Sequence, residues 1–318
     1  MCIVDLASRK KTLRKLIKTQ RYYLPLIQVF ALWIGIFLLC TSPTYAQQQV
    51  KSSCSQKFAA SKCIENLSQI TPTLAQANVV YLGETHDSPE DHRNQLKIIQ
   101  ELYQTNPKIA IALEMFQRPY QGVINQYLAG KLTEKELLEK SEYEKRWGFP
   151  WENYAPILRF AKEKKLPVLA LNTPTEITHK VVQSGLESLT PSERQFIPPS
   201  SEIRTDNKEY RQRLLATFQQ HQAVNHGSVT NVDRFFLAQV LWDETMAEGV
   251  ATFVKAHSDY QVIVLAGQGH IIYGYGIPSR VARRLKGKLI QRSVLLSPPD
   301  EESVSKDGAI ADFIFFKN

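Results

Sequence analysis

The 318-residue sequence predicts an α/β fold: a mostly parallel, doubly wound sheet flanked by helices, with an inserted helical subdomain. Three observations lead to this prediction. Short apolar runs alternate with segments of helical periodicity, which is typical of strands joined by helical crossovers. Glycine or a polar residue ends each of the first four runs. Residues at about 173–257 show helical patterns and no strand pattern, so we expect them to form the insertion.

The expected elements follow one another from residue 78. Strands are expected at 78–83, 109–114, 167–171, 261–266, 289–296 and 309–316. An antiparallel edge pair is one option for the last two. Helices are expected at about 89–104, 121–129, 133–143, 152–164, 174–185, 207–222, 232–255 and 278–285. In the third of these helices, Thr133 and Glu136 form the pattern of a capping box.

The first 46 residues form a pattern typical of a secretory signal peptide. Seven lysines and arginines and a single acidic residue precede an apolar stretch at 24–40. The motif Thr-Tyr-Ala then ends at Ala46, where we expect signal peptidase to cleave. The alternatives are an uncleaved membrane anchor and a lipid-modified Cys40, and association with the membrane requires one of them. We therefore expect an exported protein, either periplasmic or held on the outer side of the inner membrane.

The positive charge of the chain is concentrated in that same segment. It carries +6 of the formal net charge of +8, so the body is nearly neutral. The body has no basic patch interleaved with aromatic residues, and we expect no nucleic-acid binding. Residues 47–76 form a polar lead-in to the domain expected at 77–318. The lead-in contains Cys54 and Cys63, a pair that predicts a disulfide worth about 2–3 kcal/mol in an exported chain.

Two apolar runs end in a glycine that is followed by a histidine. The first ends in Gly-Glu-Thr-His at His86 and the second in Gly-Gln-Gly-His at His270. The carboxyl ends of parallel strands meet at one edge of a sheet, where ligands bind. We therefore expect five residues that follow such strands to converge there: Glu84, His86, Glu114, Asn172 and His270. Two histidines and two carboxylates suit a divalent metal or acid–base chemistry.

Simpler explanations compete with some of these assignments. Arg118 comes four residues after Glu114, and an ion pair between the two would explain the carboxylate. Gln239 and Asp243 share one face of a helix and either line the site or face solvent. The chain has no Gly-x-Ser-x-Gly motif, which argues against a serine hydrolase.

Six segments, in this order, resemble the ChaN-like family of exported, iron-regulated haem-binding proteins within the Tiki superfamily. They are LGETH at 82–86, LEMF at 113–116, WENYAP at 151–156, LNTP at 171–174, AQVLWDETMA at 238–247 and AGQGH at 266–270. The resemblance covers about 79–283. It implies an α/β core with a helical subdomain, and haem binding in iron uptake. Binding between the two protomers of a homodimer is one option.

The resemblance also implies an iron ligand for haem. Tyr154 lies in the WENYAP segment and is the expected axial ligand, with Tyr143 and His179 as the next candidates. Arginine or lysine side chains would pair with the propionates.

An alternative function follows from the wider superfamily, whose metal-dependent peptidases and macrolide esterases share the glycine–histidine segments. On this reading His86 and His270 would bind a divalent ion such as Mn, Co or Zn. Glu84 and Glu114 would complete the metal site or act as catalytic acids and bases. Haem binding is the function expected first, and a Tiki-like metal-dependent hydrolase is the alternative.

Overall fold

The computed structural model describes residues 54, 57–58, 60–215, 231–286, 289–298 and 308–316. The predicted signal peptide, its cleavage site and Cys40 lie outside the described residues. Every element discussed below belongs to one compact unit of the chain. In the described part of the chain, no helix has the length and apolar character needed to cross a membrane.

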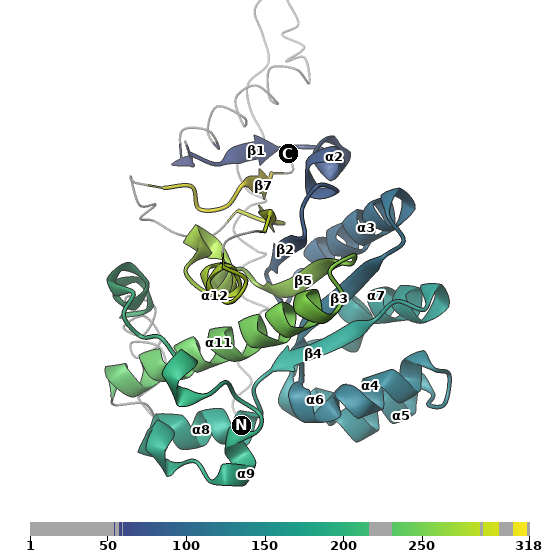
Figure 1. The fold of residues 1–318 in the computed structure, drawn as a ribbon. Coiled ribbons are helices and arrows are strands. Elements are labelled where there is room, and N and C mark those ends of the chain that lie inside the picture. Colours follow the sequence, from purple (N-terminus) through teal and green to yellow (C-terminus); the bar gives the residue numbers. More distant parts are fainter. Residues whose placement is uncertain are drawn as a thin grey trace, which may run out of the picture. The chain divides into compact units, whose positions relative to one another are not determined.

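A sheet of seven described strands forms the centre of the fold (Figure 1). Their bounds are β1 (Lys62–Ile64), β2 (Val79–Glu84), β3 (Ile109–Gln117), β4 (Val168–Asn172), β5 (Gln261–Gly267), β6 (Gln291–Leu295) and β7 (Phe313–Phe315). The strand order is β1-β7-β6-β2-β5-β3-β4, and every neighbouring pair is parallel. This confirms the predicted α/β class.

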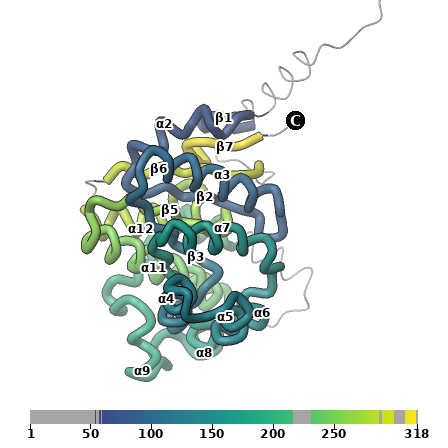
Figure 2. Tube along the Cα trace, turned by 90° about the vertical axis from the view of Figure 1, so that its right-hand side faces the viewer, coloured from purple at the N-terminus to yellow at the C-terminus, as the bar shows by residue number. Residues whose placement is uncertain are grey.

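One end of the sheet differs from the sequence-based expectation. The strands β6 and β7 are parallel, so the expectation of an antiparallel edge pair was wrong. A strand that was not predicted, β1, pairs with β7 at the edge, and Figures 1 and 2 show the two side by side. The strand β1 has three residues, too few to show the period-two pattern by which strands are recognised.

Helices cover both faces of the sheet. Their bounds are α2 (Thr71–Leu74), α3 (Pro89–Thr105), α4 (Gln121–Leu128), α5 (Glu134–Ser141), α6 (Tyr143–Arg146), α7 (Trp151–Lys164), α8 (Thr175–Ser184), α9 (Pro191–Arg194), α11 (Val232–Ala256) and α12 (Ile277–Arg284). Successive residues of a strand point to opposite faces. Accordingly, Val80 and Leu82 join the apolar cluster that contains α3 and α7 residues, whereas Val79 and Tyr81 join the one under α11 and α12.

Local signals in the sequence explain where two of these helices begin. The side chain of Ser88 accepts a hydrogen bond from the backbone amide of Asp91 and caps α3. At α5 the predicted capping box is present, with Thr133 and Glu136 each accepting from the other's backbone amide. Such caps satisfy amides that have no partner inside the helix, and each contributes about 1 kcal/mol.

The described residues between β4 and β5 contain helices and no strand, as predicted for the insertion. Residues 208–215 are also helical. Two small apolar clusters hold this region against α11 and are separate from the two sheet clusters. One contains Ile177, Val181 and Leu241, and the other contains Tyr210 and Phe236. The long helix α11 therefore joins the insertion to the sheet, because its other apolar residues pack beneath β2 and β5.

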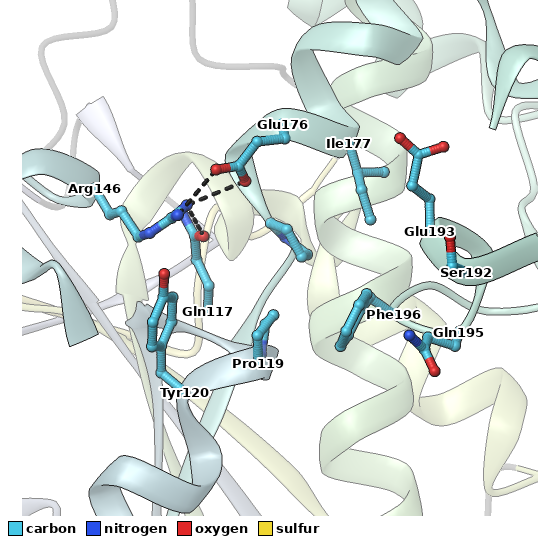
Figure 3. Close-up of a pocket in the computed structure, with 11 residues that line it drawn as sticks. Gln117, Pro119, Tyr120, Arg146, Glu176, Ile177, Ser192, Glu193, Gln195 and Phe196 are labelled. Atoms are coloured by element: carbon cyan, nitrogen blue, oxygen red, sulfur yellow. Dashed lines mark hydrogen bonds and ion pairs between the residues drawn. The ribbon is translucent and has the colours of Figure 1, made fainter. Parts of the chain in front are cut away.

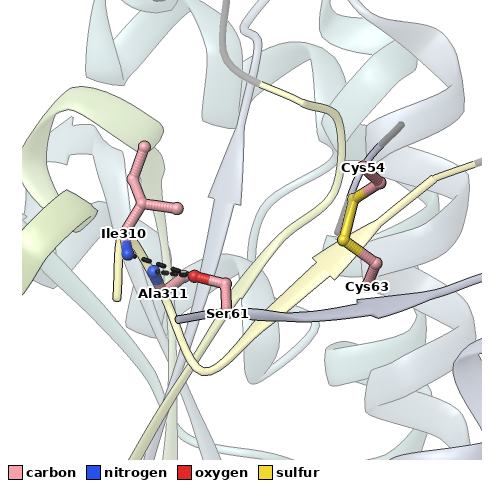
Figure 4. Close-up of a disulfide and its surroundings, with 5 residues drawn as sticks. All are labelled: Cys54, Ser61, Cys63, Ile310 and Ala311. Atoms are coloured by element: carbon pink, nitrogen blue, oxygen red, sulfur yellow. Dashed lines mark hydrogen bonds between the residues drawn. A yellow bond between two sulfur atoms is a disulfide. The ribbon is translucent and has the colours of Figure 1, made fainter. Parts of the chain in front are cut away.

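The predicted disulfide between Cys54 and Cys63 is present (Figure 4), with the two Cα atoms 6.2 Å apart. Close by, the hydroxyl of Ser61 accepts hydrogen bonds from the amides of Ile310 and Ala311. These contacts tie the start of the described chain to its last strand.

Candidate functional site

The carboxyl ends of β2, β3 and β5 lie next to one another in the sheet, as the sequence predicted. Glu84 at the end of β2 pairs in register with Gly267 at the end of β5. A Cβ atom on Gly267 would lie 2.8 Å from Cε1 of His86 and 3.7 Å from Oε2 of Glu114. Glycine is required there because the imidazole of His86 packs directly on the backbone of β5.

The first half of the site is a histidine held by a buried carboxylate. His86 donates from Nδ1 to Oε1 of Glu84 over 2.9 Å. The hydroxyl of Tyr154 donates to that same oxygen over 2.7 Å, and Gln95 donates to the other oxygen over 2.6 Å. With its Nδ1 proton fixed by Glu84, His86 has Nε2 free to act as a base.

Aromatic rings enclose the ring of His86. Trp147 meets it edge-on with centroids 4.7 Å apart, and Phe149 lies at 4.9 Å. The His86 side chain nevertheless keeps 27% of its surface exposed, so a ligand can reach it.

The second half of the site is a histidine between two carboxylates. His270 donates from Nδ1 to Oδ1 of Asp243 over 2.8 Å, and its Nε2 lies 3.3 Å from Oε1 of Glu114. Tyr210 donates to the other oxygen of Asp243 over 2.6 Å. The backbone amide of Gly267 donates to Glu114 over 2.7 Å.

Charge coupling dominates the electrostatics of this second half. Burial opposes ionisation of Glu114, but the adjacent His270 and His86 and the Gly267 amide outweigh it and lower the pKa of Glu114 to about 2. Burial likewise disfavours the charged form of His270, yet Glu114 and Asp243 raise its pKa well above the ordinary value. The pKa of His86 is also raised, because Glu84 and Glu114 outweigh its burial. The coupling therefore favours the charged forms of both Glu114 and His270.

Two other residues named in the sequence analysis make contacts of their own. The side chain of Arg118 reaches Glu248 at 2.7 Å and the carbonyl of Thr245, so its expected ion pair with Glu114 was wrong. Asn172 ends β4, and its side-chain oxygen accepts from the amide of Thr173, its own neighbour in the chain.

Three residues around the site were not assigned to it from the sequence. His92 is buried and donates to the carbonyl oxygen of His86 over 3.0 Å. The spacing of His92 and Gln95 with the apolar Ile99 places them on the buried face of α3, a signal that the sequence contained. The sequence contained no such signal for Tyr210, because its hydrogen-bond partner Asp243 lies 33 residues away in the chain.

The candidate haem ligands lie in different surroundings. Tyr154 is fully buried with its hydroxyl donating to Glu84, and burial together with Glu84 raises its pKa. Tyr143 is also buried, and its pKa is raised by burial. Both tyrosines are therefore poorly placed in this conformation to lose a proton and meet an iron that arrives from solvent. His179 is exposed on α8.

The structure does not support the predicted divalent-metal site. Within the described part of the chain, no group of three or more His, Cys, Asp or Glu side chains is arranged to hold a metal ion. The potential ligands are already engaged with other side chains. Glu84 accepts hydrogen bonds from three side chains, and the two ring nitrogens of His270 contact Asp243 and Glu114.

A pocket of about 370 Å³ lies in the same domain, where the end of β3 meets the insertion (Figure 3). It is lined by Gln117, Pro119, Tyr120, Arg146, Pro174, Glu176, Ile177, Ser192, Glu193, Gln195 and Phe196. The guanidinium of Arg146 lies 2.9 Å from Glu176 and 2.7 Å from Glu142. It also lies 5.0 Å from the centroid of the Tyr120 ring. Sequence reasoning missed this pocket because its walls come from four separate segments.

We call the group of Glu84, His86, Glu114, Asp243 and His270 the strand-end site. The fold and the family match define an α/β protein of the Tiki superfamily. The chain belongs to its family of ChaN haem-binding uptake proteins, whose model matches residues 70–281. This confirms the resemblance that the sequence segments indicated.

Individual proteins show the same relationship. The chain is 26% identical over 264 residues to the chloroplastic protein RETICULATA-RELATED 5 of Arabidopsis thaliana; the match covers 76% of this chain and 34% of that protein, so it spans about a third of the relative. Among solved structures, ChaN of Campylobacter jejuni, described with cofacial haem, matches with a TM-score of 0.59 and 19% identity, covering 77% of this chain and 90% of that one. The erythromycin esterase EreC matches with a TM-score of 0.43 and 16% identity, covering 77% of each chain.

Proposed function

We propose that this protein binds haem and takes part in haem or iron handling outside the cytoplasm. The observation that carries the proposal is membership of the haem-binding ChaN family across residues 70–281. The structural similarity to a ChaN protein described with cofacial haem supports it.

The pocket at the end of β3 contains several residues of the types that a haem site uses, although Glu176 and Glu193 also line it. A haem site needs apolar walls, an iron ligand and a cation near the propionates. Pro119, Pro174 and Phe196 supply apolar walls, Tyr120 supplies a phenol, and Arg146 supplies a cation. Bound haem would supply a ferric iron and two carboxylates for these side chains to hold. The arginine fork suits a carboxylate because it can donate two parallel hydrogen bonds.

Titration of the purified protein with hemin tests this proposal. We expect a saturable shift of the Soret band with a defined stoichiometry, because a built pocket binds a fixed number of haem groups. A ratio of one haem per two chains would favour the homodimer that the sequence analysis gave as one option. A featureless titration, equal to a buffer blank, would contradict haem binding.

Export is proposed from the amino-terminal pattern of charge, apolar length and small residues. Expressed in a bacterial host with its own export machinery, the protein should be recovered outside the cytoplasm with Gln47 as its first residue. Intact-mass and amino-terminal analysis measure this directly. Recovery of the uncleaved chain in the cytoplasm would contradict it, whereas an uncleaved or lipidated chain in the membrane fraction would identify one of the two anchored forms.

A second candidate function, hydrolysis at the strand-end site, is favoured by one observation. His86 and His270 each hold a carboxylate on Nδ1, and both lie beside Glu114. This arrangement suits general acid–base chemistry, with His86 as the base and Glu84 as the residue that orients it. Glu84 itself is a poor base because it is buried and already accepts three hydrogen bonds. Ester hydrolysis that depends on His86 is the test.

A further inference from the structure

We propose that the aromatic turn, residues 147–149 between α6 and α7, is a hinged cover that must open before a ligand can reach Nε2 of His86. The turn consists of Trp147, Gly148 and Phe149. The cover controls access to the strand-end site, so it goes beyond both proposed functions. Its opening can be measured whatever that site binds.

The free nitrogen of His86 is enclosed on more than one side. Glu84 binds Nδ1, which leaves Nε2 to meet a ligand. The backbone of β5 lies on one side, since a Cβ atom on Gly267 would stand 2.9 Å from Nε2. The rings of Trp147 and Phe149 lie with their centroids 4.7 and 4.9 Å from that of the imidazole. Because β5 is held inside the sheet, a ligand larger than water gains room only when the turn moves.

The backbone of the turn is free to rotate. Neither Gly148 nor Phe149 forms a backbone–backbone hydrogen bond with any described residue. Gly148 has a φ of 81°, in the left-handed region that glycine enters and leaves at little cost. It is exposed, and a Cβ atom built on it would meet nothing within 4 Å. Rotation at Gly148 therefore breaks no backbone hydrogen bond and meets no neighbour.

The segments on either side of the turn are fixed, which confines the movement to the turn. Before it, the guanidinium of Arg146 donates to Gln117 of β3 and to Glu176 of α8, each over 2.9 Å (Figure 3). After it, Trp151 begins α7, and its indole N–H donates to Glu134 over 2.8 Å. The turn is thus a short free stretch between two anchored helices.

The closed position of the turn carries a cost that opening relieves. The indole Nε1–H of Trp147 is buried and forms no hydrogen bond. The hydroxyl of Tyr154 lies near it, but not in the geometry of a hydrogen bond. A buried donor without a partner is unfavourable, and water satisfies it once the ring turns outward. Trp147 and Phe149 are both half-buried, so opening gives up less apolar contact than the movement of a core ring would.

The test is the rate at which diethyl pyrocarbonate acylates each histidine, read by proteolysis and mass spectrometry. A neutral imidazole nitrogen attacks the reagent and displaces ethyl carbonate, and the reagent must pass the rings of the turn to reach His86. His179, which is exposed on α8, is the reference within each protein. All rates are measured at one pH, and circular dichroism confirms that each variant is folded.

The variants separate the hinge from the general effect of a strained backbone. Gly148→Ala penalises the left-handed φ of the closed turn, and Gly148→Asn does so less, because asparagine tolerates that region better. Gly130→Ala is the matched control. Gly130 lies beyond the end of α4, is exposed, has a φ of 74° and likewise has nothing within 4 Å of its Cβ position.

We expect His86 to react more slowly than His179 in the wild type, because the closed turn covers it. Gly148→Ala should raise the rate at His86, relative to that at His179, by about 5–30-fold, the equilibrium ratio that corresponds to a side chain in the left-handed region. Gly148→Asn should lie between the wild type and Gly148→Ala. Gly130→Ala should leave the rate at His86 unchanged.

Equal rates at His86 in the wild type, Gly148→Ala and Gly130→Ala would overturn the hinge. A wild-type His86 that reacts as fast as His179 would overturn the cover. If Gly148→Ala fails to fold, Gly148→Asn takes its place in the comparison. Phe149→Ala removes one ring and should also raise the rate, and a rate equal to that of the wild type would overturn the role of the rings.

Discussion

Replacing Glu244 with alanine should lower the free energy of unfolding by about 3–5 kcal/mol. Glu244 is completely buried on α11. Its carboxylate contacts Arg280 at 3.2 Å, Arg283 at 2.7 Å and Arg284 at 2.6 Å. Removal of the carboxylate leaves positive charges close together in a medium that solvates them poorly, which is why breaking a buried ion pair is far more costly than breaking an exposed one.

Most of this loss of stability should come from two of the three arginines, Arg280 and Arg284. The side chains of Arg280 and Arg284 are 5% and 6% exposed, so water cannot replace Glu244 around them. Arg283 is 36% exposed and can turn toward solvent. The loss also affects the strand-end site, because Arg280 lies over the ring of Tyr210, which donates to Asp243.

Urea unfolding measures this change, with Glu187→Ala as the matched control. Glu187 is 91% exposed and pairs with Arg194 at 3.4 Å, so its removal should cost between 0 and about 1 kcal/mol. The contacts of Glu244 on α11 with three arginines of α12 should hold the two helices together. Equal unfolding midpoints for Glu244→Ala and Glu187→Ala would contradict this.

Replacing His86 with alanine should lower ester hydrolysis by about 10²–10⁴-fold, the usual contribution of a positioned general base. His86 is the more exposed histidine of the strand-end site, and Glu84 orients its ring. Only the neutral imidazole can accept a proton. Because the pKa of His86 is raised, the rate should increase as the pH rises through and above the ordinary histidine value of 6.5.

A chromogenic ester serves as substrate, and each assay is run with and without added Mn, Co or Zn. His179→Ala is the control, because His179 is an exposed histidine on α8. If the wild type fails to hydrolyse the ester under any of these conditions, or His86→Ala retains the wild-type rate, the strand-end site is not a hydrolase site.

The central part of the fold could be predicted from the sequence because its signals are local. β2 and β5 are uninterrupted apolar runs that end at glycine, and this pattern placed Glu84, His86 and His270 at one edge of the sheet. The end of β3 was placed less well. The strand continues past Glu114 to Gln117 with a shift in its pairing to β4, and such an irregularity leaves no periodic signal.

The remaining features depend on contacts between residues far apart in the chain. Arg118 stands four residues from Glu114 but binds Glu248, 130 residues away, because β3 carries its side chain toward α11. The pocket beside Tyr120 exists only once α6, α8 and the segment at 192–196 pack against the end of β3. Sequence spacing gives no information on contacts between segments so far apart in the chain, so this pocket was not predicted.

The measurement that tests the central claim most directly is the hemin titration of the purified wild-type protein. The account predicts a saturable Soret shift with a fixed ratio of haem to protein. A spectrum that stays equal to that of free hemin throughout the titration would contradict it.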